Sequence, residues 1–407
     1  MIPRARPSYH WADLCAAWHA CRDAVEQFES ALATYFNLNQ AIVFPYGRSA
    51  IYACLRALEQ PGGEVVQPAY NCVVVAHATM CAGYRPVFVD AQPHSPNQDP
   101  GAMVERVHST TVAVMPTSIF GLSFEAKALC EAIRQRNPKA LILLDCCQAF
   151  DACWHGERLA SQGDAALLAF GLGKPMTTLY GGALLTNRDD LAQAVRQYRH
   201  TTFRTPGRVA ALRRWSYFLG SWLALLSPCV RLTDWLEHVD TPLQRYLLTL
   251  RAREAIRLPA DHDVLMLPLE AAIGRAQLQR VAGFMQRRRE IAAIYSQALG
   301  NVPGLELLPW TDGASYAIYA VRLQQLAQRQ HVLKSMRQGS VQGDTVLSYV
   351  IPSLACYRAQ GYTGTPFPQA VAWSQSILNL PNHPTMSDKQ VWRVVRAVRG
   401  ALGESCD

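Results

Sequence analysis

A lysine in a glycine-rich loop is the residue of this chain best placed to act as a nucleophile. Lys174 lies between two apolar runs, Ala165–Phe170 and Ala183–Thr186, which have the pattern of buried strands. Glycines stand on both sides of it, at Gly173 and at Gly181-Gly182, and they let the backbone approach a ligand closely. A lysine partly removed from water can form a Schiff base with a carbonyl or with pyridoxal 5′-phosphate (PLP). A lysine in a loop between two strands can also be an ordinary solvated residue, so other segments must support this interpretation.

A carboxylate at the end of an apolar strand gives that support. Asp145 follows the run Leu141–Leu144 and is followed by Cys146, Cys147 and Gln148. Burying a carboxylate is costly unless a cation or hydrogen-bond donor meets it. The protonated pyridine nitrogen of PLP is such a partner, and holding that proton makes PLP an electron sink. The alternative is that Asp145 caps a helix.

Two further segments could hold an anionic cofactor. In Pro45–Ala50 a strand ends and a helix begins, so the backbone N–H groups near Gly47, Arg48 and Ser49 form an anion site. Ser49 can add its hydroxyl, or it can be a plain helix-capping residue. The turn Pro68–Cys72 can line a cofactor at a strand end, or it can be only the connection inside a βαβ unit.

The elements that must position these residues alternate along the chain from Gln40 to Asn187. Near-continuous apolar strands that alternate with helices predict an α/β fold with a mostly parallel sheet covered on both faces. Such sheets bind ligands at the carboxyl ends of their strands, where the motifs above fall. The expected strands are Ala41–Phe44, Glu64–Gln67, Pro86–Asp90, Thr111–Pro116, Leu141–Asp145, Ala166–Phe170 and Ala183–Thr186, and the helices between them include Ser49–Leu58, Val73–Ala82 and Glu125–Arg134.

The pattern changes after Asn187 and predicts a second, smaller domain. Residues 190–258 have a helical pattern, one long amphipathic helix is expected over Leu269–Leu299, and a strand over Tyr316–Leu323 precedes a last helix after Met386. We therefore expect a large PLP-binding domain over residues 1–258, with an N-terminal helical segment and a hydrophobic helical insertion at about 200–258. A smaller α+β domain would cover residues 259–407.

Composition narrows the class of protein. The chain has 407 residues and a net charge of +8, which fits an anionic substrate or an anionic membrane surface, and no nucleic-acid-binding motif accompanies it. Many of the twelve cysteines lie in apolar runs, and Met1–Asp13 has no apolar core, so we expect a reduced, cytoplasmic protein. Cys146-Cys147 lacks nearby metal-ligand partners, so no metal site is expected.

An uncharged run in the insertion suggests a contact with lipid or with another subunit. Residues 215–230 lie between Arg213-Arg214 and Arg231 and include Trp, Tyr and Phe. The run is shorter than the ~20 residues needed to span a bilayer. Aromatic residues beside arginines are typical of helices that lie in a membrane interface. The alternative is a helix packed at a dimer interface.

With these segments in order, the chain resembles the DegT/DnrJ-type sugar aminotransferases, which are fold-type-I PLP enzymes that aminate nucleotide-linked keto-sugars. The similarity runs from about Asn37 to Asn187 and from about Leu267 to the end. The matching pieces are Gly47–Ala50, Pro68–Cys72, Gly121, Asp145–Gln148, Gly163-Asp164, Lys174 with Gly181-Gly182, Ala271–Leu278 and Leu378–Pro381.

The resemblance implies a role for each site residue. Lys174 would form the Schiff base with PLP, Asp145 would pair with the pyridine nitrogen and Gln148 would contact the ring hydroxyl. The backbone of Gly47, Arg48 and Ser49 would hold the phosphate, and Cys72 would stand where an aromatic residue stacks on the ring. The family also implies a homodimer with sites at the subunit interface and glutamate as the usual amino donor.

The chain departs from the family pattern in its phosphate and substrate contacts. Ala169 replaces a phosphate-binding serine five residues before the lysine, and Cys72 replaces the stacking aromatic. Phe150-Asp151 stands in place of a His-Gly pair. Asp263 and Leu265 match an Asn and an Arg that the neighbouring subunit normally supplies. An aspartate that faced a phosphate would repel it, so this loop must be arranged differently.

The sequence therefore predicts a PLP-dependent aminotransferase. It would transfer an amino group from a donor, typically glutamate, to a nucleotide- or lipid-linked keto-sugar in surface-glycan or secondary-metabolite biosynthesis. One alternative is a PLP enzyme acting on a non-sugar ketone, and another is a non-catalytic PLP-fold protein with a regulatory role. In the family's dehydratase branch a histidine replaces the lysine, so Lys174 argues against that branch.

Overall fold

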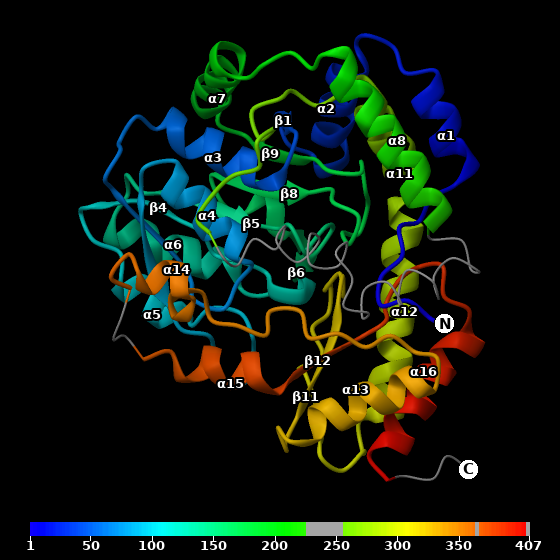
Figure 1. Ribbon diagram of the computed structural model, residues 1–407. Helices are drawn as coiled ribbons and strands as arrows, with labels where there is room; N and C mark the ends of the chain where they lie inside the picture. Colours follow the sequence, from blue (N-terminus) through cyan, green and yellow to red (C-terminus); the bar gives the residue numbers. More distant parts are fainter. Residues whose placement is uncertain (225–254, 363–365, 404–407) are drawn as a thin grey trace.

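A seven-stranded sheet forms the centre of the larger part of the molecule (Figure 1). The computed structural model describes residues 1–224, 255–362 and 366–403. The strand order is β1-β9-β8-β5-β4-β2-β3, and β9 runs antiparallel to its neighbours β1 and β8 while the other pairs are parallel. The strands are β1 Gln40–Phe44, β2 Glu64–Pro68, β3 Arg85–Val89, β4 Thr111–Val114, β5 Leu141–Asp145, β8 Ala165–Ala169 and β9 Gly182–Thr186. All seven expected strands are confirmed to within two residues at each end.

Helices cover both faces of this sheet, as the apolar strands require. Successive strand residues point to opposite faces, so Leu144 of β5 belongs to one buried cluster and Leu143 to another. The Leu144 face packs against α2 (Ala24–Phe36), α6 (Ala126–Arg136) and α11 (Pro268–Leu278). The Leu143 face packs against α3 (Gly47–Ala57), α4 (Val73–Cys81) and α7 (Asp189–Thr202). The α/β expectation and the expected helices of this region are confirmed.

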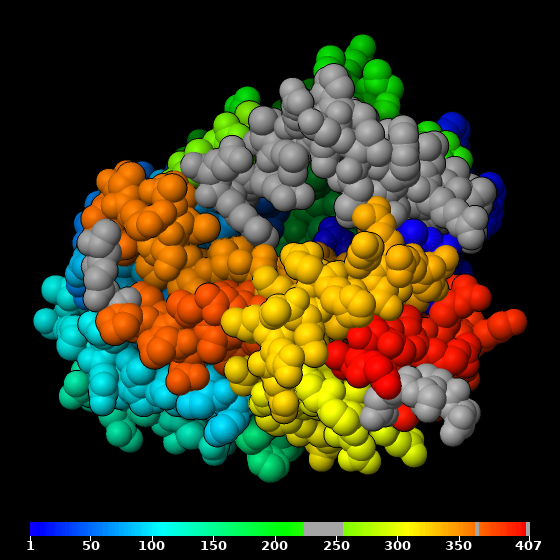
Figure 2. All heavy atoms as spheres, turned by 60° about the horizontal axis from the view of Figure 1, so that its bottom comes forward, coloured from blue at the N-terminus to red at the C-terminus, as the bar shows by residue number. Residues whose placement is uncertain are grey.

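A smaller antiparallel sheet lies beyond α11 and has its own core. Its strands are ordered β10-β11-β12 and pack with three helices. Ile2 joins this core and pairs with Val341, so the N-terminal residues lie on the smaller part of the molecule. In Figure 2 the C-terminal segments, yellow to red, gather on one face. The elements are β10 Leu305–Leu307, β11 Tyr319–Leu323, β12 Ile377–Leu380, α12 Val281–Leu299, α13 Gln328–Gln338 and α16 Asp388–Ala401.

Short elements lie in the connections within each of these two parts. They are α5 Pro100–Glu105, η1 Ile119–Gly121, β6 Cys153–Trp154, β7 Glu157–Arg158, η2 Leu159–Ser161, η3 Ile351–Ser353, α14 Ala355–Arg358 and α15 Pro368–Ser376. The β6–β7 hairpin is antiparallel and carries the chain from β5 back toward the start of β8.

The prediction of one continuous helix over Leu269–Leu299 is wrong. The chain forms α11 and α12 with a break at Gln279-Arg280. The two helices serve different cores: α11 packs against α1 and α2, whereas the C-terminal half of α12 packs in the core of the smaller sheet. Arg280 at the break forms an ion pair with the fully buried Asp13. Helical periodicity in the sequence does not show where a chain leaves one core and enters another.

The insertion begins with α8 (Arg208–Ala224), which lies beside the N-terminal helix α1 (Trp11–Trp18) (Figure 1). Its aromatic residues pack inward on the N-terminal segment. Phe218 meets Tyr9 edge-on at 5.4 Å between ring centroids, and Trp215 meets Trp18 at 6.1 Å. The first part of the uncharged run is therefore helical as expected, and residues 225–230 lie outside the described residues.

Candidate active site

Lys174 lies in the loop that joins β8 to β9, as the sequence predicts. Its backbone N–H donates to the carbonyl of Gly171 at 2.9 Å, which closes a tight turn. The far side of the loop is tied to the strand end and to α11: the N–H of Thr178 donates to the carbonyl of Phe170, and the N–H of Thr177 donates to the Gln277 side chain. The side chain of Lys174 is half-buried and lines a cavity.

The glycine pair brings the lysine loop against the first turn of α3. A Cβ on Gly182 would fall 2.4 Å from Cα of Gly47, and Gly181 has a φ of +103°, which disfavours other residues. The N–H of Gly181 also donates to the carbonyl of Pro45 at 2.7 Å. Gly47 is in turn close to Ala169, because a Cβ on Gly47 would lie 3.0 Å from the Ala169 methyl group. The strand end before Lys174 and the start of α3 thus form one surface.

Asp145 ends β5 and is buried, with 3% of its surface exposed. Its Oδ1 accepts the N–H of Cys147 at 3.0 Å, and no ion pair is formed by this carboxylate within the described part of the chain. Burial raises the pKa of the Cys147 thiol well above its ordinary value; the charge of Asp145 adds to the increase and Lys174 opposes it. Asp145 and Lys174 therefore both lie near the Cys147 thiol. A buried carboxylate without a cation fits the protonated nitrogen of a PLP ring.

The cavity brings together Lys174, Gln148 and Cys72 from the larger part of the molecule. It has a volume of about 260 Å³. Gln148 is oriented by its Oε1, which accepts the N–H of Phe120 at 2.9 Å. Cys72 is the N-cap residue of α4. Asp145, Gly47, Arg48 and Ser49 lie outside this cavity wall, although Arg48 is near enough to Cys72 for the two to interact.

The start of α3 lies against the lysine loop, but the N–H of Ser49 donates to the carbonyl of Tyr46 at 3.0 Å and the side chains have partners of their own. The Ser49 hydroxyl donates to the carbonyl of His262 at 2.7 Å, so its proton already has an acceptor. Arg48 stacks over the ring of Tyr46 at 5.6 Å, and burial lowers the pKa of its guanidinium. The expected anion site thus retains the helix end, while Ser49 holds the loop at residues 259–265 in place.

That loop explains how an aspartate is tolerated where the family has an asparagine. Arg204 binds Asp263 with two hydrogen bonds, of 2.6 and 2.9 Å, and so neutralises it. Asp261 accepts a hydrogen bond from Tyr46 and pairs with Arg214. Leu265 is partly buried against the core of the α3 face. The acidic loop is therefore paired with arginines of the same chain.

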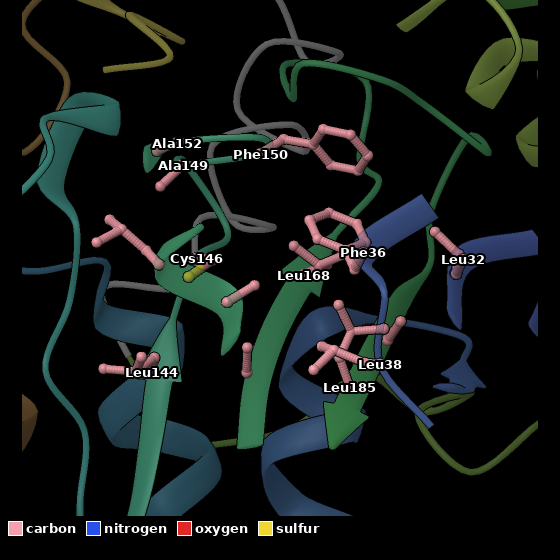
Figure 3. Close-up of a cluster of buried hydrophobic side chains, with 14 of the residues drawn as sticks. Leu32, Phe36, Leu38, Leu144, Cys146, Ala149, Phe150, Ala152, Leu168 and Leu185 are labelled. Atoms are coloured by element: carbon pink, nitrogen blue, oxygen red, sulfur yellow. The ribbon is translucent and has the colours of Figure 1, made fainter. Parts of the chain in front are cut away.

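Phe150, which stands where the family pattern has the histidine of a His-Gly pair, packs in a buried hydrophobic cluster. Its ring meets that of Phe36 edge-on at 5.1 Å, and both lie among the buried side chains of β5 and β8 (Figure 3). Asp151 adopts a φ of +60° and pairs with Arg158. The segment after Gln148 thus has a structural role in this chain.

The part of the cavity wall that comes from the smaller part of the molecule was not predicted from the sequence. Arg288 of α12 and Asn379 of β12 line it together with Asn382, Asp344 and Arg4. These residues come from the smaller part of the molecule and from the N-terminus, and only Asn379 falls within a piece that resembles the family, Leu378–Pro381.

The described residues hold neither a cluster of metal ligands nor a membrane-spanning helix. They contain no group of three His, Cys, Asp or Glu side chains placed to hold a metal ion. Within the same residues no helix combines the length and the apolar character needed to cross a membrane.

The comparison with protein families decides the class of the protein. The model of the DegT/DnrJ/EryC1/StrS aminotransferase family matches residues 13–225 and 252–399. The chain belongs to this family. Membership confirms the resemblance noted from the sequence, the aminotransferase class and PLP as the cofactor.

Curated relatives match over most of their length. The spore coat polysaccharide biosynthesis protein SpsC of Bacillus subtilis is 26% identical over 392 residues, which covers 94% of this chain and 91% of the relative. GDP-perosamine synthase of Caulobacter vibrioides is 25% identical over 386 residues, with 93% and 90% covered.

Solved structures of the same fold cover the whole chain. PseC of Helicobacter pylori, an aminotransferase involved in the biosynthesis of pseudoaminic acid, superposes with a TM-score of 0.79 at 18% identity and covers 99% of both chains. The aminotransferase TlmJ of Streptoalloteichus hindustanus gives 0.77 at 23% identity, again with 99% of both chains covered. The fold-type-I architecture expected from the sequence is confirmed.

Proposed function

We propose that this aminotransferase moves an amino group from an amino acid to a nucleotide-linked keto-sugar, with Lys174 as the catalytic lysine. The observation that carries the proposal is the arrangement of Lys174 and Asp145 around Cys147. Lys174 lines the cavity, and the carboxylate of Asp145 is buried without a cation among the described residues. PLP, when bound, supplies an electron sink for the carbon that loses a proton. The donor becomes a 2-oxo acid and the keto-sugar becomes an amino sugar.

Each site residue has a defined task in this proposal. The Lys174 amine holds the cofactor and carries the proton between the two carbons on either side of the transferred nitrogen. Asp145 would stabilise a protonated ring nitrogen, and Gln148 would contact the ring hydroxyl. The N–H groups of Gly47, Arg48 and Ser49 would bind the phosphate at the start of α3, and Cys72 would stand beside the ring in place of a stacking aromatic residue.

The relatives support a sugar as the amino acceptor. They include GDP-perosamine synthase and a dTDP-4-dehydro-2,3,6-trideoxy-D-glucose 4-aminotransferase of Saccharopolyspora spinosa, both matched over at least 90% of their length. We infer the same substrate class for this chain, with glutamate as the donor, in the biosynthesis of a surface glycan or a secondary metabolite. We also propose two domains, divided near residue 258, and a homodimer whose partner subunit completes the site.

The face formed by α1 and α8 supports a peripheral membrane contact. Trp11 and Trp18 of α1 are 71% and 76% exposed, and Leu212 and Leu223 of α8 are 68% and 60% exposed. The only acidic residue of the two helices, Asp13, is fully buried against Arg280. Exposed tryptophans and leucines without acidic neighbours favour an anionic bilayer surface. We propose that this cytoplasmic enzyme binds such a surface through α8 and α1.

The proposed reaction is tested with the purified protein, PLP, L-glutamate and a panel of nucleotide-linked keto-sugars. Mass spectrometry should detect the amino sugar and 2-oxoglutarate in equal amounts. A non-sugar ketone that is aminated while every keto-sugar is left unchanged would contradict the substrate class. Light scattering at micromolar protein should report twice the mass of one chain, and an active monomer would contradict the homodimer.

A further inference from the structure

A buried cation that has no counter-ion among the described residues lines the same cavity as Lys174. Arg288 of α12 is 4% exposed, and its guanidinium Nη1 donates to two backbone carbonyls, those of Ala317 at 2.9 Å and of Asn382. It forms no ion pair with any acidic residue that the structure describes. Burial lowers the pKa of Arg288 to about 10. The carbonyls supply only partial charges, so the full charge of Arg288 has no counter-ion in the described chain.

Another buried arginine of this chain shows the contrast. Arg214 is 5% exposed and pairs with Asp261 at 3.1 Å and with Glu270 at 3.6 Å. A buried charge without a partner costs several kcal/mol, which is why buried ions are normally paired. Arg288 departs from that rule and lines a cavity, so a bound anion is the natural counter-ion.

Two asparagines on the same wall also lack part of their hydrogen bonding. Asn379 accepts the N–H of Val346 with its Oδ1, and Asn382 donates with its Nδ2 to the carbonyl of Tyr316 at 2.8 Å. These bonds fix the amide orientations and leave Asn379 Nδ2 and Asn382 Oδ1 buried without a partner, as is Arg288 Nε. All three residues line the cavity. A ligand at this wall would supply what they lack.

We propose that Arg288, assisted by Asn379, binds the carboxylate of the amino donor. The inference rests on the proposed function, because the donor must enter the cavity that Lys174 lines. A guanidinium binds a carboxylate through two parallel N–H groups. Arg288 and Asn379 line the same cavity as Lys174, so a donor carboxylate bound by them would lie in the cavity that the lysine lines. Asp344 lines the cavity too, but it is paired with Arg4.

The test follows the first half-reaction of the PLP-loaded enzyme with L-glutamate by its change in cofactor absorbance. Arg288→Gln should raise the apparent Kd for glutamate by about 10- to 100-fold, the effect of losing a hydrogen bond to a charged group. The rate with benzylamine, a donor without a carboxylate, should stay within a few-fold of the wild type. Arg288→Lys should recover part of the glutamate affinity.

A neighbouring arginine provides the matched control. Arg287 is on the same helix and pairs with Glu290 and Asp388, so Arg287→Gln should leave the Kd for glutamate unchanged. Asn379→Asp is a second variant that keeps the acceptor for Val346 and places a negative charge beside the expected carboxylate. It should also raise the Kd for glutamate, which keeps the test available if Arg288→Gln does not fold.

Three outcomes separate the claims. An unchanged Kd for glutamate in Arg288→Gln and Asn379→Asp would overturn the donor-carboxylate site and leave the proposed reaction intact. Weaker binding of dTDP, measured by calorimetry, with unchanged glutamate binding would assign Arg288 to a diphosphate and also overturn it. A wild-type enzyme that reacts with no amino acid would instead contradict the proposed function itself.

Discussion

Gly182 and Gly47 touch backbone to backbone: a Cβ on Gly182 would fall 2.4 Å from Cα of Gly47. This contact fixes the distance between the loop that carries Lys174 and the helix end that we propose for the phosphate. A side chain at residue 182 would separate the two halves of the site.

Gly182→Ala should therefore weaken both folding and PLP binding. We expect a loss of about 1–3 kcal/mol in the free energy of unfolding, the usual cost of overpacking a core, together with a lower affinity for PLP. Urea unfolding and PLP titration measure the two effects. Gly171→Ala is the control, because nothing lies within 4 Å of its Cβ position and its φ is not positive. Equal free energies of unfolding and equal PLP affinities in the two variants would show that the close contact between Gly182 and Gly47 is not required.

Asp145→Asn should lower turnover by orders of magnitude and leave the fold intact. The amide keeps the acceptor for the N–H of Cys147 but no longer stabilises a protonated pyridine nitrogen. Steady-state turnover and the unfolding midpoint should be measured on the same preparation. A variant that loses stability but keeps its turnover would make Asp145 a structural residue.

Glu270 should make the stability of the protein depend on pH. Burial raises its pKa from 4.5 to about 7, while Arg214 and the N–H of Leu267 partly oppose the increase. The Glu270 carboxyl loses its proton at a lower pH in the unfolded chain than in the folded protein. The free energy of unfolding therefore falls as pH rises from about 4.5 to about 7. It stays constant above that.

Glu270→Gln removes this titration and retains a hydrogen-bond acceptor for Leu267. Relative to the wild type, the variant should gain stability across this pH window, by up to about 3 kcal/mol. Urea unfolding between pH 4.5 and 8 measures the difference. A difference that does not change with pH would mean that Glu270 ionises normally in the folded protein.

Much of the larger part of the molecule could be predicted from the sequence, because each strand there is an apolar run ended by a turn. The same logic located Lys174 and Asp145 at the ends of β8 and β5 and led to the family. The break at Arg280 could not be predicted, since both halves of Leu269–Leu299 have helical periodicity and only tertiary packing separates them. Arg288 was also missed, because its lack of a counter-ion is visible only when its surroundings are known.

The membrane contact is tested by flotation with anionic liposomes. Trp11→Glu combined with Leu223→Glu should abolish flotation, because both side chains are exposed on the α1–α8 face. Trp222 is unsuitable for this test since it packs on Tyr9. Trp392→Glu, which changes an exposed tryptophan on α16, should float like the wild type. A wild-type protein that stays at the bottom of the gradient would contradict the membrane contact and favour packing of the α1–α8 face against another subunit.

The central claim, that Lys174 holds the cofactor, is tested most directly by borohydride reduction of the PLP-loaded protein followed by peptide mass mapping. Reduction makes the link between PLP and its lysine permanent. The account predicts a pyridoxyl phosphate group on the peptide that contains Lys174 and none in Lys174→Ala, while the exposed control Lys139→Ala is labelled like the wild type. A label on another lysine, or an unlabelled protein that still transaminates, would contradict it.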